Sequence, residues 1–386
     1  MKVAVVTGTR AEFGLLAPLM HKIESSEKLD LQLIVTGAHL LEEFGSTVDE
    51  IRAEGFTIDR TVPEITSALT GQEVARQVGA GVLSFTDSLE ELSPDVVVLL
   101  GDRYELLAAA TAAFFLDIPI VHLHGGEVTQ GAFDDAIRHA ISKFARIHAV
   151  AAPEYAERLI RAGEQPDSVH VVGGLGVHAL EVMEKLSRGE LETLLGFVLK
   201  SPVLVVTYHP VTAGERDTQS EINSLISALG KFPSATVIFT LPNADPEHRI
   251  IAESIKQAVA KHANWYVFAS LGIQKYSSLL EQASVVVGNS SSGLLEAPSC
   301  GVPTVNIGPR QDGRIKAVSV LSCGTQQFEI EESIQLALSP YFQKSLVGME
   351  NPYGGPGAPD RILSILEVTP FGTLGPKKYF DPTGKD

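Results

Sequence analysis

The sequence predicts an α/β fold built from two Rossmann-like, doubly wound domains. Short β-branched runs alternate with longer segments of helical period in both halves of the chain, which is typical of parallel sheets crossed over by helices. The 386 residues are too many for one ordinary core, and the 44% that are hydrophobic are enough to bury two. A polar, strand-poor stretch at 184–202 separates the two sets of strands. We therefore expect domains at 1–185 and 186–365, followed by a tail at 366–386.

The strand candidates of the first half are six apolar runs. They are KVAVV at 2–6, LQLIV at 31–35, DVVVLL at 95–100, IPIVHL at 118–123, IHAVAA at 147–152 and VHVVG at 169–173. Between the second and third runs, Val74, Val78, Val82, Phe85 and Leu89 recur at steps of three and four. This spacing predicts one face of a long amphipathic helix.

The second half repeats the pattern with five apolar runs. They are VLVVTYH at 203–209, TVIFTL at 236–241, WYVFAS at 265–270, SVVVGN at 284–289 and TVNIG at 304–308. DRILSILEV at 360–368 predicts a final helix. In doubly wound folds ligands bind beyond the carboxyl ends of the strands, so with two facing halves we expect the site in the cleft between them.

Charge and cysteine content argue against several kinds of function. The net charge of -17 disfavours non-specific nucleic-acid binding, which needs a basic face. Cys300 and Cys323 have no CxxC spacing, which argues against a disulfide framework and a zinc site.

The sequence also offers no export or membrane segment. The apolar run at the amino terminus is too short for a signal peptide, and LLAAATAAFFL is broken by Asp117 before it could span a bilayer. We expect a cytoplasmic protein with no membrane or nucleic-acid partner.

Two familiar cofactor motifs are missing from the sequence. No GxGxxG follows the first strand and no Walker GxxxxGK[ST] occurs, which argues against NAD binding and ATP hydrolysis. His122 and His124 form an HxH pair that can bind a metal from one face of a strand, but further ligands must then come from elsewhere. We expect no cofactor and no metal, with the HxH pair as the alternative.

The first half carries polar residues where its strands end. Arg10 lies at the exit of the first strand, in TGTRAEFG, and a guanidinium at the start of a helix makes an anion site. Asp102 follows the DVVVLL strand. Asp102 and Glu105 also fit a D-x-x-E capping box, which would explain both residues without any chemistry.

The second half carries a phosphate-site signal in GNSSSGLLEAPSCGVP. Ser290, Ser291 and Gly293 follow a strand and are expected to open a helix whose N–H groups suit a diphosphate. Glu296, one turn later, can accept hydrogen bonds from ribose hydroxyls. A plain serine cap is the alternative. Other strand exits carry His209, which could also be an ordinary loop histidine, and Asn243, Asp245 and Arg310.

These motifs together identify a family. Along nearly its whole length the chain resembles the hydrolysing UDP-N-acetylglucosamine 2-epimerases of sialic-acid-type biosynthesis, which share the GT-B glycosyltransferase fold. The resemblance rests on TGTRAEFGLLAPLM, TGAHLLEEFG, GDRYELLAAATAA, HGGEVTQGAFDDAIRHAISK, YHPVT, PNADPE, GNSSSGLLEAPSCGVPTVNIGPRQ and NPYGGPGAPDRI. It implies a homo-oligomeric enzyme that converts UDP-N-acetylglucosamine and water to UDP and N-acetylmannosamine.

The resemblance also implies roles for individual residues. The acid and base work falls to Asp102, Glu127, Asp134 and His209, because crowded carboxylates can divide the acid and base roles. Arg10, the serines at 290 and 291 and Arg310 are expected to hold the diphosphate. His39 matches a family position near the sugar. Gly125 and Gly126 are expected to let the HGGE loop approach the sugar closely.

His124 is the departure from the family pattern, because members often carry a carboxylate there, as EGGE. We therefore expect His124 to contact the sugar, and we keep UDP-2,4-diacetamido-2,4,6-trideoxyglucose, used toward legionaminic acid, as the alternative substrate. A non-hydrolysing 2-epimerase and a UDP-sugar glycosyltransferase are further alternatives. A binding protein without chemistry is disfavoured by the lack of a signal peptide.

Overall fold

The computed structural model describes residues 1–41, 47–66, 70–129, 133–211, 217–242 and 247–381. The chain forms two compact units, each with its own sheet. Unit 1 comprises residues 1–127, 133–179 and 356–386, and unit 2 comprises 128–132 and 180–355. In the described residues no helix is both long enough and apolar enough to cross a membrane.

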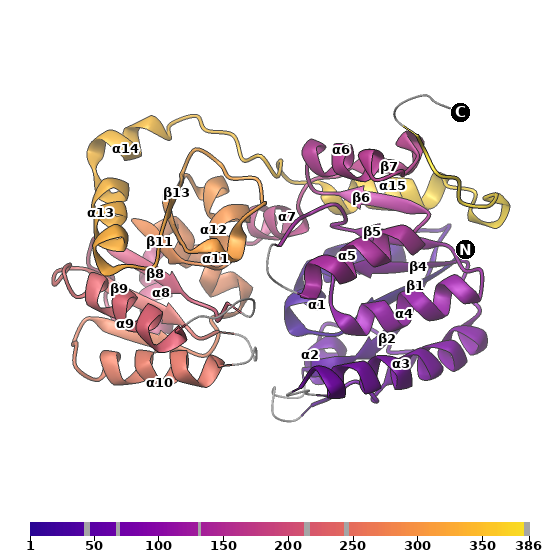
Figure 1. The fold of residues 1–386 in the computed structure, drawn as a ribbon, viewed down its shortest axis with the longest axis horizontal. Coiled ribbons are helices and arrows are strands. Elements are labelled where there is room, and N and C mark those ends of the chain that lie inside the picture. Colours follow the sequence, from indigo (N-terminus) through magenta and orange to yellow (C-terminus); the bar gives the residue numbers. More distant parts are fainter. Residues whose placement is uncertain (42–46, 67–69, 130–132, 212–216, 243–246, 382–386) are drawn as a thin grey trace. The chain divides into compact units, whose positions relative to one another are not determined.

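Unit 1 is built on a seven-stranded parallel sheet of order β3-β2-β1-β4-β5-β6-β7 (Figure 1). Its strands are β1 (Lys2–Thr7), β2 (Asp30–Thr36), β3 (Arg60–Val62), β4 (Val96–Leu100), β5 (Ile120–Leu123), β6 (Ile147–Val150) and β7 (Val169–Val171). The six strands expected from the sequence are confirmed. β3 was missed because three residues are too few to show a pattern.

Helices cover both faces of this sheet. They are α1 (Arg10–Glu24), α2 (Val48–Ala53), α3 (Gly71–Leu92), α4 (Tyr104–Phe115), α5 (Phe133–Phe144), α6 (Pro153–Arg161) and α15 (Ala358–Val368), with α7 (Leu175–Val182) leading into unit 2. Val3 and Val5 belong to one hydrophobic cluster with α1 and α15, while Ala4 and Val6 belong to a second cluster with α3 and α4. A strand buried on both faces reads as one continuous apolar run, which is why β1 was visible in the sequence.

Unit 2 repeats the architecture with a six-stranded parallel sheet of order β10-β9-β8-β11-β12-β13. The strands are β8 (Val203–Thr207), β9 (Thr236–Thr240), β10 (Trp265–Phe268), β11 (Val285–Gly288), β12 (Thr304–Ile307) and β13 (Val320–Cys323). The helices are α8 (Arg188–Leu195), α9 (Thr218–Leu229), α10 (His248–Val259), α11 (Gly272–Gln282), α12 (Ser292–Leu295), α13 (Gln327–Leu338) and α14 (Pro340–Ser345). Only β13, whose burial is partial, was not expected.

The expected interdomain connection at 184–202 is instead part of unit 2. Ser187 and Glu190 form a reciprocal capping box that starts α8. Leu191, Leu195 and Leu199 are buried in one core cluster with β8 and α11. The stretch looked like a linker because its apolar residues form a narrow stripe among charged ones.

The final helix is confirmed, but it belongs to unit 1 rather than to the second domain. Ile362 and Leu366 of α15 are buried in the cluster that contains α1. Lys22 of α1 pairs with Asp360 at 2.6 Å. Figure 1 shows α15, in yellow, among the elements of unit 1. The expected boundary at 365 therefore fails, because the chain returns to its first unit near residue 356.

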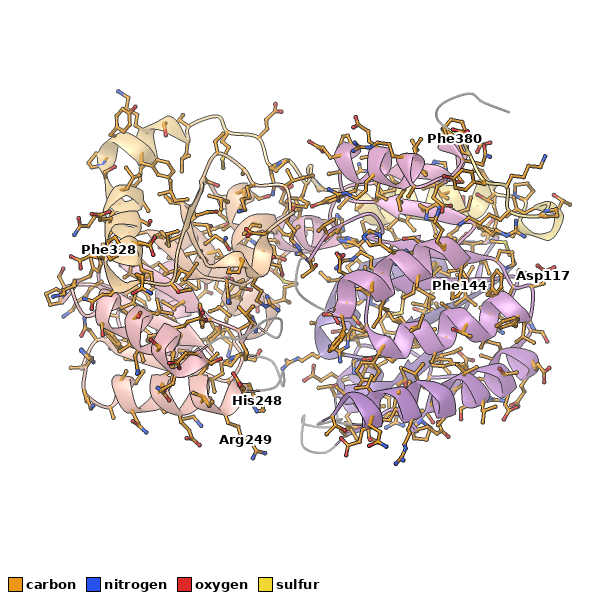
Figure 2. All side chains as sticks on the ribbon, in the orientation of Figure 1. Asp117, Phe144, His248, Arg249, Phe328 and Phe380 are labelled. Carbon is orange, nitrogen blue, oxygen red and sulfur yellow. The ribbon has the colours of Figure 1, made fainter. Side chains whose placement is uncertain are left out.

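Residues 374–380, which we call the C-terminal strap, fasten onto the same unit. Lys377 Nζ donates to the carbonyls of Ser142, Lys143 and Ala145 at 3.0, 3.0 and 2.7 Å, and so caps the carboxyl end of α5. Phe380, labelled in Figure 2, lies beside α6, where its N–H donates to the carbonyl of Gly163 at 2.9 Å. The strap therefore fixes the far end of α5, the helix whose first turn contains Asp134.

A buried carboxylate completes this attachment. Glu164 accepts from His148, Lys143 and Lys377 at 3.0, 2.8 and 2.6 Å. Burial alone would raise the pKa of Glu164, but these three hydrogen bonds outweigh it and lower the pKa to about 2.

Candidate active site

The candidate site residues of unit 1 follow the carboxyl ends of β1, β4 and β5. β1 and β4 are neighbours, yet the chain leaves them toward opposite sides of the sheet, so the switch point of this doubly wound fold lies between them. β5 lies next to β4. Arg10, Asp102 and Glu127 therefore follow adjacent strands at the edge where such folds bind ligands.

Asp102 is held by a buried arginine and does not cap a helix. α4 begins at Tyr104, its cap residue is Arg103, and no side chain caps it. The capping-box alternative is therefore wrong. Asp102 Oδ2 instead pairs with the guanidinium of Arg138, whose side chain is only 3% exposed. Arg138 lies on α5, and the fork of its guanidinium fixes the direction of the carboxylate.

Arg138 was not expected from the sequence. It follows Asp134 by four residues on α5, so both side chains lie on one helix face. Asp134 is exposed in the first turn of that helix. A carboxylate and a guanidinium at this spacing are usually an exposed surface pair, and only the fold shows that the arginine is buried against Asp102.

A second pair of carboxyl groups lies beside the switch point. Glu105 is 1% exposed and accepts from Arg103 Nε at 2.7 Å, while Glu12 Oε2 accepts from the N–H of Gly8 at 2.9 Å. Burial, reinforced by the neighbouring Glu105, raises the pKa of Glu12 to about 8. A Cβ on Gly8 would lie 2.9 Å from Glu105, so only glycine leaves room for this group.

Arg10, expected to bind the diphosphate, pairs in this structure with Glu50 of α2. Arg10 Nε lies 2.9 Å from Glu50 Oε2, and the two side chains are 52% and 45% exposed. An exposed pair of this kind is worth at most about 1 kcal/mol, so an incoming anion can replace Glu50 as the partner of Arg10 at little cost.

His39 and His122 are both fully buried in unit 1. His39 is fully buried, with Thr7 Oγ1 at 3.1 Å from Nε2 and Thr47 Oγ1 at 2.7 Å from Nδ1. Burial lowers the pKa of His39 to about 4. The expectation that His39 lies near the sugar remains a prediction, and its ring nitrogens already have protein partners.

His122 is buried inside β5. Its Nε2 lies 2.7 Å from the carbonyl of Gly101, and Nδ1 lies 3.0 Å from Ser142 Oγ. Burial lowers the pKa of His122 to about 3. Because Nε2 donates to the Gly101 carbonyl and the hydroxyl of Ser142 faces Nδ1, both ring nitrogens of His122 already have protein partners, which disfavours the HxH alternative.

His124 and Glu127 form a pair at the end of β5. The strand stops at Leu123, and His124 has φ 61°, a left-handed backbone that costs a non-glycine residue on the order of 1 kcal/mol. His124 Nδ1 lies 2.9 Å from Glu127 Oε1, and the N–H of Leu175 points at His124 Nε2 at 3.2 Å. Both ring nitrogens are therefore engaged within unit 1.

The glycine pair of this loop packs tightly against its surroundings. Gly126 has φ 76°, and a Cβ there would lie 2.5 Å from the carbonyl oxygen of Tyr155. A Cβ on Gly125 would lie 3.0 Å from His122 Nδ1. Close packing against protein therefore accounts for both glycines, and no approach to a sugar is needed to explain them.

In unit 2, Asn289 ties three strand ends together. Its Oδ1 accepts from the N–H of His209 at 2.7 Å, and its Nδ2 donates to the His209 carbonyl at 2.8 Å. Its own carbonyl accepts from Arg310 at 3.1 Å and from Gln311 at 2.8 Å. Asn289 is fully buried. His209 and Arg310, both expected at the site, are thus brought together by a residue that the sequence did not single out.

His209 is neutral in this environment. Its side chain is buried, and burial, helped by the positive charge of Arg310, lowers the pKa of His209 to about 3. At neutral pH the imidazole therefore offers one donor and one acceptor rather than a positive charge.

The serine stretch forms only a single helical turn. α12 covers Ser292–Leu295 and a 3-10 turn (Ala297–Cys300) follows it. Ser290 Oγ accepts from the N–H of Ser292 at 3.4 Å, and Ser292 Oγ lies 2.6 Å from the hydroxyl of Tyr276. The expected helix is present but only one turn long, so any anion here would rely on turn amides and hydroxyls rather than on a helix dipole.

The remaining expected residues of unit 2 are placed as follows. Gly293 packs so closely on Thr304 that a Cβ would lie 2.6 Å from the threonine methyl. Glu296 follows α12 and is half-buried. Asn243 and Asp245 lie outside the described residues.

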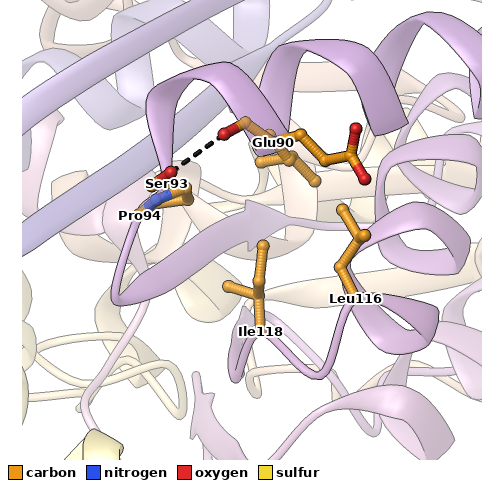
Figure 3. A pocket seen from close by; sticks show the side chains of 6 residues that line it. Glu90, Ser93, Pro94, Leu116 and Ile118 are labelled. Carbon is orange, nitrogen blue, oxygen red and sulfur yellow. Dashed lines mark hydrogen bonds between the residues drawn. The ribbon is translucent and has the colours of Figure 1, made fainter.

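A separate hollow of unit 1 lies away from these groups. It measures about 370 Å³ and is lined by Leu89, Glu90, Ser93, Pro94, Leu116 and Ile118 (Figure 3). These residues precede β4 and β5, at the amino-terminal edge of the sheet. The hollow is therefore on the opposite edge from Asp102 and Glu127.

The fold and the strand-end residues define a two-domain α/β protein of the GT-B type. The chain belongs to the UDP-N-acetylglucosamine 2-epimerase family, whose sequence model matches residues 21–367. It is 36% identical over 382 residues to the GDP/UDP-N,N'-diacetylbacillosamine 2-epimerase (hydrolyzing) of Campylobacter jejuni, covering 98% of this chain and 99% of that protein.

A second relative supports this membership, and a solved structure shares the fold. The UDP-N,N'-diacetylbacillosamine 2-epimerase (hydrolyzing) of Legionella pneumophila is 34% identical over 370 residues, covering 96% of both chains. The UDP-GlcNAc 2-epimerase of Methanocaldococcus jannaschii, solved with UDP-GlcNAc and UDP, has a TM-score of 0.77 at 17% identity and covers 96% of this chain and 100% of that one. The last likeness concerns the fold alone.

Proposed function

We propose that the chain is a hydrolysing 2-epimerase of UDP-N,N'-diacetylbacillosamine, which is UDP-2,4-diacetamido-2,4,6-trideoxyglucose. The products are UDP and 2,4-diacetamido-2,4,6-trideoxymannose. The observation that carries this proposal is the identity of 36% and 34%, over nearly the full length, to two relatives named for this substrate. The sequence alone ranked UDP-N-acetylglucosamine first, and the relatives favour the alternative.

The reaction sets the chemical groups that the site must supply. A base removes the proton from C2, the electron pair forms a C1–C2 double bond, and the C1–O bond to the diphosphate breaks. Water then adds its oxygen to C1 of this glycal while an acid delivers a proton to the opposite face of C2. Two proton transfers and one departing diphosphate therefore need separate groups.

Unit 1 supplies carboxylates suited to the proton transfers. Glu127 is 3% exposed and held by His124, Asp102 is held by Arg138, and Asp134 lies in the first turn of α5. We assign the acid and base work to these three carboxylates together with His209. Neutral His209 can donate one hydrogen bond and accept another at neutral pH.

Unit 2 supplies groups suited to the diphosphate. Ser290 and Ser291 lie at the turn that follows β11, and Arg310 is anchored beside them through Asn289. Preorganised donors of this kind stabilise the charge that develops on the leaving group. Arg10 of unit 1 is a further candidate because its pairing with Glu50 is weak and exposed.

UDP-N-acetylglucosamine remains the second candidate substrate, because the family model that matches the chain is described by that sugar. The two donors differ only at C4 and C6. A comparison of their kcat/KM values therefore measures how the site recognises the substituents at C4 and C6.

The test is kcat/KM for release of the nucleoside diphosphate, UDP or GDP, from three donors by the purified chain. We expect UDP-N,N'-diacetylbacillosamine to exceed UDP-N-acetylglucosamine by about ten- to two-hundred-fold, the discrimination that a pocket makes between small substituents. The GDP-linked diacetamido sugar, included because one relative is named for both nucleotides, should be slower than the UDP donor. A preference for UDP-N-acetylglucosamine contradicts the proposed sugar, and a preference for GDP contradicts the nucleotide.

A further inference from the structure

The pairing of His124 with Glu127 has a defined direction. The N–H of Leu175 can only donate, so His124 Nε2, at 3.2 Å, must carry the lone pair. The proton of the neutral ring is then on Nδ1, which donates to Glu127 Oε1 at 2.9 Å. Three groups therefore form a chain of donors, from Leu175 through His124 to Glu127.

The first donor in this chain is fixed by secondary structure. Leu175 is the first residue of α7, and the first N–H groups of a helix have no partner inside it. One of these N–H groups thus sets which nitrogen of His124 carries the proton. Leu175 is 1% exposed, so the contact is shielded from water.

The backbone of the loop is fixed as well. The N–H of His124 donates to the carbonyl of Ala149 at 3.0 Å, which ties the loop to β6. The carbonyl of Gly126 accepts from the guanidinium of Arg158. His124 keeps its left-handed φ of 61° within these contacts. With the backbone fixed, rotation of the imidazole toward a ligand would break both of its ring hydrogen bonds, to Glu127 and to the N–H of Leu175.

We propose that His124 is a positioning residue, which orients Glu127 for proton transfer and does not hydrogen-bond the sugar. This inference rests on the proposed function, in which Glu127 takes part in the chemistry. It replaces the expectation that His124 reads the substrate. An acid or base whose orientation is set by a third group is the arrangement on which many proton-transfer sites depend.

Two substitutions separate positioning from sugar binding. His124→Asn keeps an N–H donor close to the place of Nδ1 and tolerates a left-handed backbone. His124→Ala removes the donor. With UDP-N,N'-diacetylbacillosamine, we expect His124→Ala to lower kcat by about ten- to a hundred-fold, the effect of a slightly misplaced catalytic group. KM should change less than about threefold, and His124→Asn should recover most of kcat.

The decisive control is a double-mutant cycle with Glu127→Gln. If His124 acts through Glu127, the double variant His124→Ala/Glu127→Gln should be no slower than Glu127→Gln alone. Losses that multiply, a rise in KM that matches the fall in activity, or a kcat for His124→Ala within twofold of the unaltered protein would each overturn the inference. His124→Gly, which suits φ 61°, replaces His124→Ala if that variant does not fold.

This design also separates the inference from the proposed function. If Glu127→Gln keeps full activity, then Glu127 has no part in the chemistry and the assignment of roles fails, whatever His124 does. If Glu127→Gln is inactive and His124→Ala is not impaired, only the positioning inference fails.

Discussion

Replacement of Glu127 by glutamine is expected to lower kcat by about a hundred- to ten-thousand-fold, the usual contribution of a positioned acid or base. The amide keeps the size of the carboxylate, and its oxygen can still accept from His124 Nδ1, now at 2.9 Å. The fold should therefore survive. The measurement is kcat with UDP-N,N'-diacetylbacillosamine together with a urea unfolding curve.

The control for this variant is Glu157→Gln, which makes the same change at an exposed position on α6 and should leave kcat unaltered.

Asp102→Asn and Asp134→Asn are each expected to lower kcat by a factor in the same range as Glu127→Gln. Asp102→Asn should also lower stability, because it leaves the buried guanidinium of Arg138 without its carboxylate. Normal turnover in all three variants would show that these carboxylates do no chemistry.

The pH dependence of stability should change when Glu12 is replaced by glutamine. The folded pKa of about 8 lies above the ordinary 4.5, so the folded chain holds a proton that the unfolded chain releases. The contribution of Glu12 to stability is then complete below pH 4.5 and is lost as the pH rises through 8. Its steepest slope is about 1.4 kcal/mol per pH unit, the value for one proton.

The measurement is the free energy of unfolding in urea at several pH values between 4.5 and 8. We expect the difference between the unaltered protein and Glu12→Gln to fall steadily over this range. The buried histidines titrate in both proteins and cancel in the difference. Glu27→Gln, an exposed change just after the same helix, should give a constant difference. A constant difference for Glu12→Gln as well would show that Glu12 is ionised in the folded protein.

The fold was predictable from the sequence where burial leaves a local pattern. Strands such as β1 and β4 are covered on both faces, so each reads as a continuous apolar run. The docking of α15 on α1 leaves no such pattern. It joins residues more than 300 positions apart, such as Lys22 and Asp360, and a helix of ordinary amphipathic character could have packed on either unit.

The strand-end residues of the candidate site could also be named from the sequence. Parallel topology alone places the residues after β1, β4 and β5 at one sheet edge, so Arg10, Asp102 and Glu127 could be named. Their partners could not. Arg138 reads as a surface residue of α5, Asn289 reads as a strand-end amide, and the N–H of Leu175 meets His124 across 51 residues of sequence. Such pairings depend on how helices, strands and loops distant in the sequence pack against one another.

The product formed in D₂O is the most direct test of hydrolysing 2-epimerisation. Proton NMR of the purified chain with UDP-N,N'-diacetylbacillosamine, and no acceptor present, should show UDP and free 2,4-diacetamido-2,4,6-trideoxymannose. Its C2 should carry one deuterium, because the proton delivered to the glycal comes from solvent-exchanged groups. A product still attached to UDP, a C2 that retains its original proton, or no UDP release without an acceptor would contradict the proposed hydrolysing 2-epimerisation.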